Sequence, residues 1–433
     1  MAKRGLVVGL SAASWFVLCM TGQAIAQTAE EDSVRGRSRP EFVPLGLELD
    51  QLLSTAGLVE PARARDRNTA AASFVVFPRL DIETAYETNL FRDTTNQVDR
   101  ILVASPRVEL RSDWANHRLS FGMGANVGRH DRHRTEDYED LFVNAGGVAD
   151  ASEMLQLHGR VEVARLHLQR GTLIDSGRTG AAVEFDQSQI AFGAVFAPDR
   201  FLFHPEFTVV SEDYLGSDGT DNDDLDRAVA TIKARFAYQW LPGTALFIEP
   251  SYNDRNYDRK RDVGGFLQDS HGTQTLVGFT WDVSGVTFLE LGVGYLRQRF
   301  DEPSFGTVEG PAVSGRLVWN PLDSLTIDAR LGRAVEEKRG VNLSGVLVTS
   351  LRSRIDYELF YDLLLSLSFD YAKEEDRFTR LTDNRFNTTF EARYLVNANW
   401  FAALTAGYDR LNAEADDSSF SNARASLRVG AQL

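Results

Sequence analysis

From about Ser73 to the end of the chain, apolar and polar side chains alternate over runs of roughly ten residues. In residues 107–114, for example, Val108, Leu110 and Trp114 would share one face of an extended strand, with charged residues on the other face. A two-sided apolar core would exclude such charges, whereas a wall between lipid and water accommodates them. The pattern therefore predicts amphipathic strands over 73–433.

The joints between these runs also alternate in length. Short joints occupy 114–117, 197–200, 241–243, 320–323 and 397–399, and long, mostly acidic joints occupy 87–99, 211–224, 253–271, 297–310 and 372–384. Transmembrane β-barrels have short periplasmic turns and long extracellular loops. We therefore predict an all-β, antiparallel, up-and-down transmembrane barrel of about 18 strands (16–18), with strands such as 201–210 and 245–252. An even count places both ends of the barrel in the periplasm.

The first residues have the features of an export signal. Lys3 and Arg4 precede an apolar stretch, and Ala24-Ile25-Ala26 offers small residues for cleavage. We expect a Sec-type signal peptide at 1–26, cleaved near Ala26, and a protein of the Gram-negative outer membrane. The chain's single cysteine, Cys19, falls inside this segment, so the mature chain would have no disulfides.

Residues 27–72 follow no strand pattern. Two polar stretches flank a leucine-rich centre, where 49–56 could form a short helix that ends before Gly57. We interpret 27–72 as a partly flexible periplasmic extension. It could be a tether, a docking element or a plug in the barrel.

Aromatic residues fall where headgroups would lie. We predict a girdle beside the short turns and another toward the long loops, because amphipathic rings prefer the membrane interface. The predicted members are Trp114, Trp240, Trp281, Trp319, Trp400, Tyr86, Tyr371 and Tyr408.

The opposite strand faces carry charges of both signs and should line the lumen. The predicted pore-lining residues are Arg107, Glu109, Arg111, Asp113, Arg160, Glu162, Lys233, Arg235, Arg330, Arg352, Arg354, Arg393, Arg424 and Arg428. Such a mixed lumen suits hydroxyl-rich solutes better than strong ion selection, although many of these charges could simply pair and stiffen the wall.

No other chemistry is indicated by the residues. The seven histidines are scattered without metal-ligand spacing, and no catalytic constellation recurs, so we expect no metal, no cofactor and no enzyme activity. The net charge of −16 argues against nucleic-acid binding. Expected contacts are outer-membrane lipid and lipopolysaccharide.

One group of motifs resembles a known family. The stretch ETAYETNLFRD at 83–93, the Ser-Asp-Trp segment that follows, Gly128-Arg129 and residues 136–140 are similar to an outer-membrane β-barrel family found beside exopolysaccharide biosynthesis genes in proteobacteria. The residues matched most closely are Asn89, Phe91, Ser112, Asp113, Trp114 and His117. The resemblance implies a barrel that assists polysaccharide export, with a periplasmic polysaccharide export protein and the polymer as partners.

Three functions stay open at this point. Polysaccharide export is favoured by the resemblance, a general or substrate-specific diffusion porin would share every physical feature, and a structural or adhesive barrel would use the long loops.

Overall fold

The computed structural model describes residues 74–432, except 113, 115–116, 176–179, 218–220, 263, 284–285, 338–344 and 416–417. The predicted signal peptide (1–26) and periplasmic extension (27–72) lie outside the described residues and stay predictions. Over the described ranges, no helix combines the length and apolar character needed to span a membrane.

The described residues form 18 strands and one short 3-10 turn, η2 (Arg134–Glu136). The strands are β1 (Phe74–Glu87), β2 (Asp99–Ser112), β3 (His117–His130), β4 (Tyr138–Ser152), β5 (Leu155–His167), β6 (Glu184–Phe196), β7 (Phe201–Tyr214), β8 (Arg227–Leu241), β9 (Thr244–Tyr257), β10 (Ser270–Val283), β11 (Thr287–Phe300), β12 (Thr307–Leu322), β13 (Leu325–Glu336), β14 (Val346–Phe360), β15 (Leu363–Asp376), β16 (Thr382–Leu395), β17 (Trp400–Asn412) and β18 (Phe420–Gln432).

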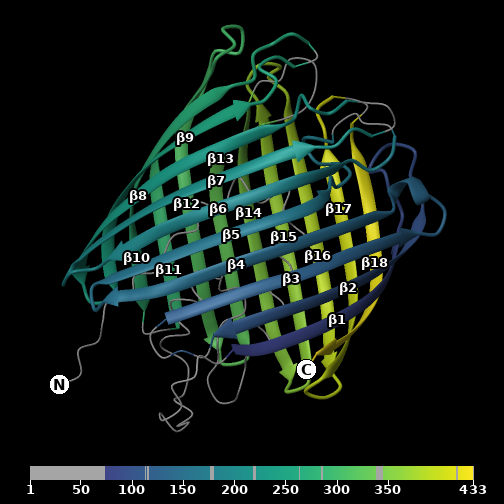
Figure 1. The fold of residues 1–433 in the computed structure, drawn as a ribbon, viewed down its shortest axis with the longest axis horizontal. Coiled ribbons are helices and arrows are strands. Elements are labelled where there is room, and N and C mark those ends of the chain that lie inside the picture. Colours follow the sequence, from purple (N-terminus) through teal and green to yellow (C-terminus); the bar gives the residue numbers. More distant parts are fainter. Residues whose placement is uncertain are drawn as a thin grey trace.

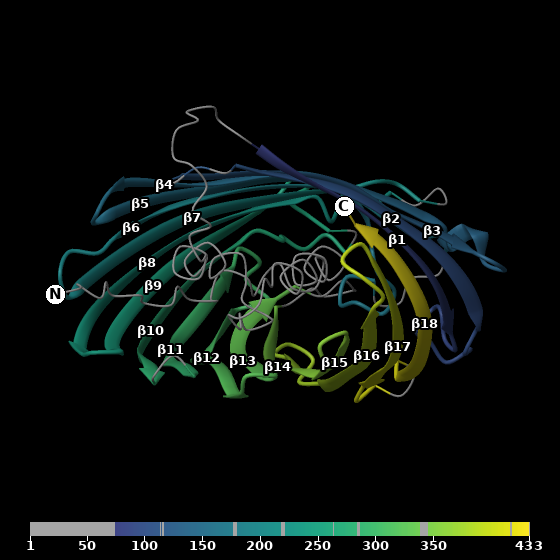
Figure 2. The same ribbon diagram turned by 90° about the horizontal axis from the view of Figure 1, so that it is seen from below.

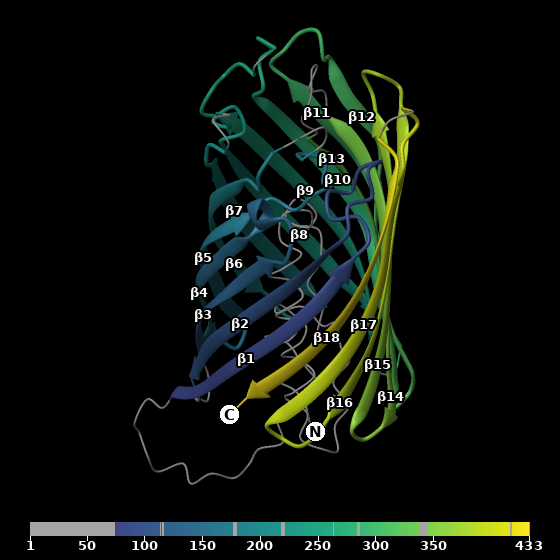
Figure 3. The same ribbon diagram turned by 90° about the vertical axis from the view of Figure 1, so that its right-hand side faces the viewer.

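Each strand pairs antiparallel with its neighbours in sequence, and β1 pairs with β18 to close a ring (Figure 1). The closing register runs from Arg79 opposite Gln432 to Glu87 opposite Arg424. Closure is required because an open sheet edge in hydrocarbon would leave backbone groups without hydrogen-bond partners. The predicted all-β barrel of 18 strands is confirmed. Figure 3 shows β1 beginning and β18 ending at the same end of the barrel.

Alternating faces build the wall as the period-two pattern requires. In β5, Val161 and Val163 point outward with 46% and 58% of their surface exposed, whereas Glu162 between them is 2% exposed and points inward. The apolar outer face is the one that meets lipid, and the polar inner face lines the lumen.

Several strands extend further toward the long loops than the pattern predicts. The strand predicted at 201–210 continues to Tyr214, and the strand predicted at 245–252 continues to Tyr257. Backbone pairing continues beyond the membrane, where both faces are polar and alternation disappears: Asp213 and Asp254 stand on outward positions there. The long joints predicted at 253–271, 297–310 and 372–384 are therefore shorter in the structure, whereas the joint predicted at 87–99 matches the end of β1 and the start of β2.

The aromatic residues predicted as girdles lie on the outer face. The five tryptophans of that set are exposed and sit beside short turns. Tyr86 and Tyr408 are exposed in the halves of their strands that lead to long loops, and Tyr371 donates a hydrogen bond to Asn384 Oδ1 (2.8 Å).

Seen along the barrel, the ring has an oval section (Figure 2). The strands β7–β10 turn one narrow end of the oval, and β16–β18 with β1–β3 turn the other. Strands β4–β6 and β12–β15 form the two long sides that face each other across the lumen.

Candidate functional site: a constriction in the lumen

The structure places the charged residues predicted to line the pore on inward positions of the wall. Those it describes are Arg107, Glu109, Arg111, Arg160, Glu162, Lys233, Arg235, Arg330, Arg352, Arg354, Arg393, Arg424 and Arg428, whereas Asp113 is outside the described residues. Their role in conduction stays a prediction.

Most of these charges form ion pairs with the next inward residue on the same strand. Arg330 Nε lies 3.0 Å from Asp328 Oδ1, Arg354 Nε lies 2.9 Å from Asp356 Oδ2, and the pair Arg160–Glu162 is equally direct. Residues two apart on a strand share a face, so acid and base alternate down the inner wall. The described wall therefore presents adjacent opposite charges and not a field of one sign.

One buried cluster braces three strands of the wall. The guanidinium of Arg235 on β8 contacts Glu249 on β9 (2.7 Å) and Glu290 on β11 (2.8 Å), and it lies 4.0 Å over the ring of Phe247. All three charged side chains are almost completely buried. This arrangement satisfies the buried guanidinium with charge-assisted hydrogen bonds.

Residues 168–175 and 180–183 are the described part of the connection between β5 and β6, and this segment enters the lumen; we call it the constriction loop. Its Leu173 packs against Val346 and Val348 on β14 and Ala372 on β15. Because β14 is the ninth strand from β5 in a ring of 18, the loop reaches the opposite wall. In Figure 2 it lies inside the outline of the barrel.

A buried ion pair holds the base of the constriction loop. Arg170 Nε and Nη2 donate to the two carboxylate oxygens of Glu136 at 2.8 and 2.6 Å, and Nη1 approaches Asp175 at 3.4 Å. The guanidinium lies 5.6 Å over the ring of Phe91. Burial lowers the pKa of Arg170, but hydrogen bonding and the charge of Glu136 outweigh it and raise the pKa above its ordinary value. The Arg170 guanidinium therefore stays charged although it is buried.

A glycine lets the loop pass close to the barrel seam. Gly171 has φ +76°, a left-handed conformation that favours glycine, and its backbone N–H donates to Asp175 Oδ2 (2.9 Å). A Cβ at this position would lie 2.7 Å from Arg92 Cδ and 3.0 Å from Phe420 Cζ. The loop is therefore in close contact with Arg92 and with Phe420 at this glycine.

Residues of the ETAYETNLFRD stretch support the loop from the seam between β1 and β18. The side chain of Asn89 is completely buried; its Nδ2 donates to the backbone oxygens of Asp93 (2.7 Å) and Ser421 (3.1 Å). Phe91 meets the ring of His133 edge-on at 5.2 Å and the guanidinium of Arg170 on its face. This motif thus anchors the first extracellular loop beneath the constriction loop.

The second group of motif residues acts at the entry of the loop. Tyr138 stacks on His167 with ring centroids 3.8 Å apart, and His167 Nδ1 lies 2.8 Å from Asp140 Oδ1. Glu136 of the same group is the partner of Arg170. The motif residues Ser112, Trp114 and His117 lie elsewhere, at the periplasmic turn, where Ser112 Oγ accepts from the backbone N–H of Leu119 (2.8 Å).

A second element narrows the same end of the lumen. Pairing between β12 and β13 stops at Ser314 opposite Gly332, while β13 stays paired with β14 as far as Glu336. Glu337, just after β13, contacts Arg255 Nη1 (3.2 Å) as well as Arg227 and Tyr257, which lie on β8 and β9. The top of β13 therefore reaches the strands that turn the narrow end of the oval.

The alternation pattern did not reveal these contacts. Arg170, Gly171 and Leu173 follow no period and were not among the predicted site residues, although Glu136 belonged to the resembling motif. A conformationally special glycine beside an arginine in a long joint was the only local signal.

A closed antiparallel ring with an apolar outer face, a charged lumen and an inward-folded loop defines a porin-type outer-membrane β-barrel. The chain belongs to the family described as "Putative beta-barrel porin 2", whose model matches residues 69–433. Comparison with the curated proteins finds no match.

The chain is also similar, at low sequence identity, to several solved structures. The structure titled "Copper transporter OprC" is 11% identical, with 84% of this chain and 81% of that chain covered and a TM-score of 0.46. Pseudomonas aeruginosa OccK2 (OpdF) is 12% identical (83% and 98% covered, TM-score 0.45), and Acinetobacter baumannii OccAB4 is 10% identical (83% and 98%, TM-score 0.44).

Proposed function

We propose that the protein is a restrictive diffusion channel for small polar solutes of the outer membrane. The observation that carries this proposal is the contact of Leu173 with Val346 and Val348 on the opposite wall. An empty barrel of 18 strands is wide enough for an aqueous channel, so a loop that crosses it sets the passage that solutes meet.

The wall chemistry supports uncharged, hydroxyl-rich solutes over ions of either sign. Pairs such as Arg354 with Asp356 offer donors and acceptors at neighbouring positions while cancelling their net charge. A hydroxyl can hydrogen-bond to both members of such a pair, but neither cations nor anions gain a continuous attractive path.

A reversible cross-link tests the role of the loop. Cys19 is the only cysteine and lies in the predicted signal peptide, so the double variant Leu173→Cys/Val348→Cys would add the only thiols of the mature barrel. With the disulfide formed, we expect slower sugar entry in a liposome-swelling assay than after reduction. The matched control is Val161→Cys/Ile190→Cys, which joins outward positions opposite each other on β5 and β6.

Equal swelling rates in the oxidised and reduced loop variant, with the disulfide verified by thiol titration, would mean that the loop does not limit solute passage. A rate that changes with redox state in the control as well would assign the effect to the barrel wall.

Assistance of polysaccharide export is the second candidate function. It is favoured by the motif resemblance, since the motif residues Phe91 and Glu136 contact Arg170 of the constriction loop. Asn89 of the same motif orders the neighbouring loop through its hydrogen bonds to Asp93 and Ser421. In this proposal a periplasmic polysaccharide export protein delivers the polymer, and lipopolysaccharide and membrane lipid surround the barrel. We propose no enzymatic activity in either case.

An in-frame deletion separates the two functions. Export predicts loss of surface and secreted polymer, periplasmic accumulation, and restoration by a plasmid copy. Unchanged polymer in all three fractions would contradict export and leave the diffusion channel.

A further inference from the structure

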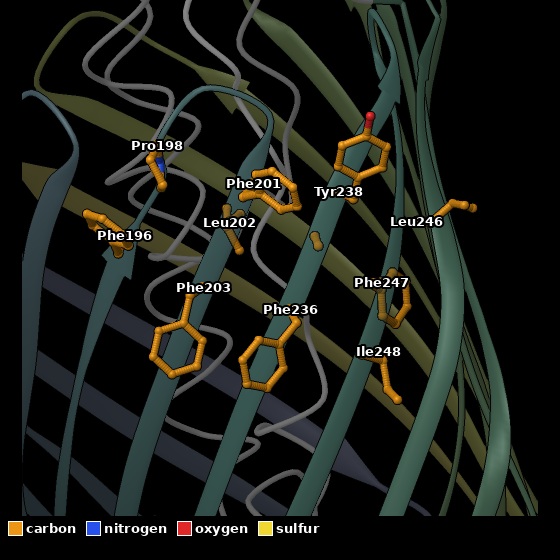
Figure 4. A pocket seen from close by; sticks show the side chains of 11 residues that line it. Phe196, Pro198, Phe201, Leu202, Phe203, Phe236, Tyr238, Leu246, Phe247 and Ile248 are labelled. Carbon is orange, nitrogen blue, oxygen red and sulfur yellow. The ribbon is translucent and has the colours of Figure 1, made fainter.

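An apolar groove lies on the outer face of the barrel, over β7, β8 and β9 near the short turns (Figure 4). It encloses about 520 Å³, within the range of ligand sites. Two ring pairs line it: Phe203 with Phe236, centroids 4.8 Å apart, and Phe201 with Tyr238, centroids 5.1 Å apart. Strand β9 contributes Ile248 to the lining.

Most of the side chains that line the groove point away from the lumen, whereas three further lining residues, Leu202, Ala237 and Phe247, are buried. Phe203, Phe236 and Ile248 are 37–48% exposed, whereas their chain neighbours Leu202 and Phe247 are buried on the inner side. These strands turn the narrow end of the oval (Figure 2), where outward side chains of adjacent strands diverge. The convex corner thus leaves a space between side chains that a flat wall would fill.

We propose that this groove is a binding site for one acyl chain of an anionic phospholipid from the periplasmic leaflet. The turn at 197–200, from which Pro198 lines the groove, places it beside the periplasmic surface, and Trp240 marks the headgroup level nearby. At this depth in the membrane the groove is surrounded by lipid hydrocarbon. An acyl chain is therefore the occupant that the apolar lining of the groove fits.

In this proposal the basic residue of the turn at 197–200 selects the headgroup. Arg200 is exposed in the turn, between the groove residues Pro198 and Phe201 in the chain. A guanidinium binds phosphate through two donors at once, which favours a lipid held at this level by its phosphate.

Binding energy here comes from packing and not from the hydrophobic effect, because the lipid leaves one hydrocarbon environment for another. Ring faces fixed by stacking offer an acyl chain many simultaneous dispersion contacts without prior ordering. A second copy of this chain is the competing occupant, and it would bring a second apolar wall instead of a phosphate.

The test is lipid retention by the full barrel purified in a mild non-ionic detergent with added phosphatidylglycerol, followed by native mass spectrometry. Ile248→Trp fills the groove from a position that faces lipid, so it should leave folding intact. We expect about tenfold lower retention in this variant, because the chain loses its contacts with one side of the groove.

The matched control is Leu404→Trp, at an exposed leucine on β17, eight strands from β9, which should retain phosphatidylglycerol as the unaltered barrel does. Folding of each variant is checked by heat-modifiable migration in gels. Arg200→Gln should lower retention of phosphatidylglycerol more than that of phosphatidylethanolamine.

Equal retention by the unaltered barrel and Ile248→Trp overturns the proposal. It is also overturned if the unaltered barrel is a lipid-free dimer by light scattering and Ile248→Trp is a monomer, since the groove would then be an interface between copies. Because the site lies outside the lumen, either result leaves the proposed channel function untouched.

Discussion

Replacing Arg170 with alanine should release the constriction loop while leaving the barrel folded. The substitution removes both hydrogen bonds to the carboxylate of Glu136 and the stacking on Phe91. Glu136 is 4% exposed, so its charge would remain buried without the guanidinium that neutralises it. The barrel should persist because its sheet registers do not involve this side chain.

The size of the effect follows from the burial of this pair. Breaking a buried ion pair by removing one partner costs about 3–5 kcal/mol, and we take the lower end because the loop adjoins the aqueous mouth. A change of about 3 kcal/mol shifts the ratio of the packed loop to the released loop by roughly 150-fold. A loop that is released in a small fraction of unaltered molecules would then be released in most variant molecules.

Single-channel recording in planar bilayers measures this shift directly. We expect Arg170→Ala to dwell far longer at a higher conductance level than the unaltered protein. The control is Arg165→Ala: Arg165 pairs with Asp186 at 2.7 Å on the outer face, with both side chains over 40% exposed. An exposed pair contributes at most about 1 kcal/mol, so its conductance should not change.

Two results would refute this reasoning. Identical conductance levels and dwell times in Arg170→Ala and the unaltered protein, with folding verified, would mean that the loop does not limit the passage. An equal change in Arg165→Ala would mean that any loss of arginine near β5 alters the channel, independent of the buried pair.

Three further changes should separate loop, wall and seam. Gly171→Ala should loosen the constriction loop, because an L-residue at φ +76° costs about 1–2 kcal/mol and its Cβ would meet Arg92. We expect faster proteolysis within the loop at an unchanged thermal midpoint of the barrel. An unchanged cleavage rate would contradict this prediction. Arg235→Ala should lower the free energy of unfolding by about 3–5 kcal/mol and so lower the thermal midpoint strongly. The control Arg111→Ala, at a half-exposed arginine, should change the midpoint little. Similar midpoints for the two variants would mean that the buried contacts of Arg235 with Glu249 and Glu290 do not stabilise the wall. Asn89→Ala should weaken the first extracellular loop by about 1–3 kcal/mol through its lost buried hydrogen bonds, seen as faster amide exchange over 88–98, and unaltered exchange there would count against it.

The architecture of the wall followed from the sequence because it depends on local, periodic constraints. An alternating strand can bury its apolar face only in lipid when its other face carries charges such as Arg354 and Asp356, and the alternation of short and long joints orders the hairpins. Strand number, face and orientation all follow from these two periods. Strand ends were less predictable, as Tyr214 and Tyr257 show, because backbone pairing continues beyond the membrane after the alternation of apolar and polar residues has ended.

The candidate site could not be predicted in the same way. Leu173 meets Val346 and Val348, which lie more than 170 residues further along the chain, and no period links such positions. The motif resemblance singled out Asn89 and Phe91 without indicating that they lie beneath the loop.

By itself, then, the sequence determined a ring of amphipathic strands, its inner and outer faces and the end that bears long loops, since each of these is decided within one strand or one hairpin. Only the tertiary structure decided that Leu173 of the constriction loop reaches the far wall, that Arg170 pairs this loop with Glu136, and that the corner at β7–β9 has an apolar groove. These features arise when ring closure brings distant segments together, and the contacts that result depend on three-dimensional packing instead of on any local pattern.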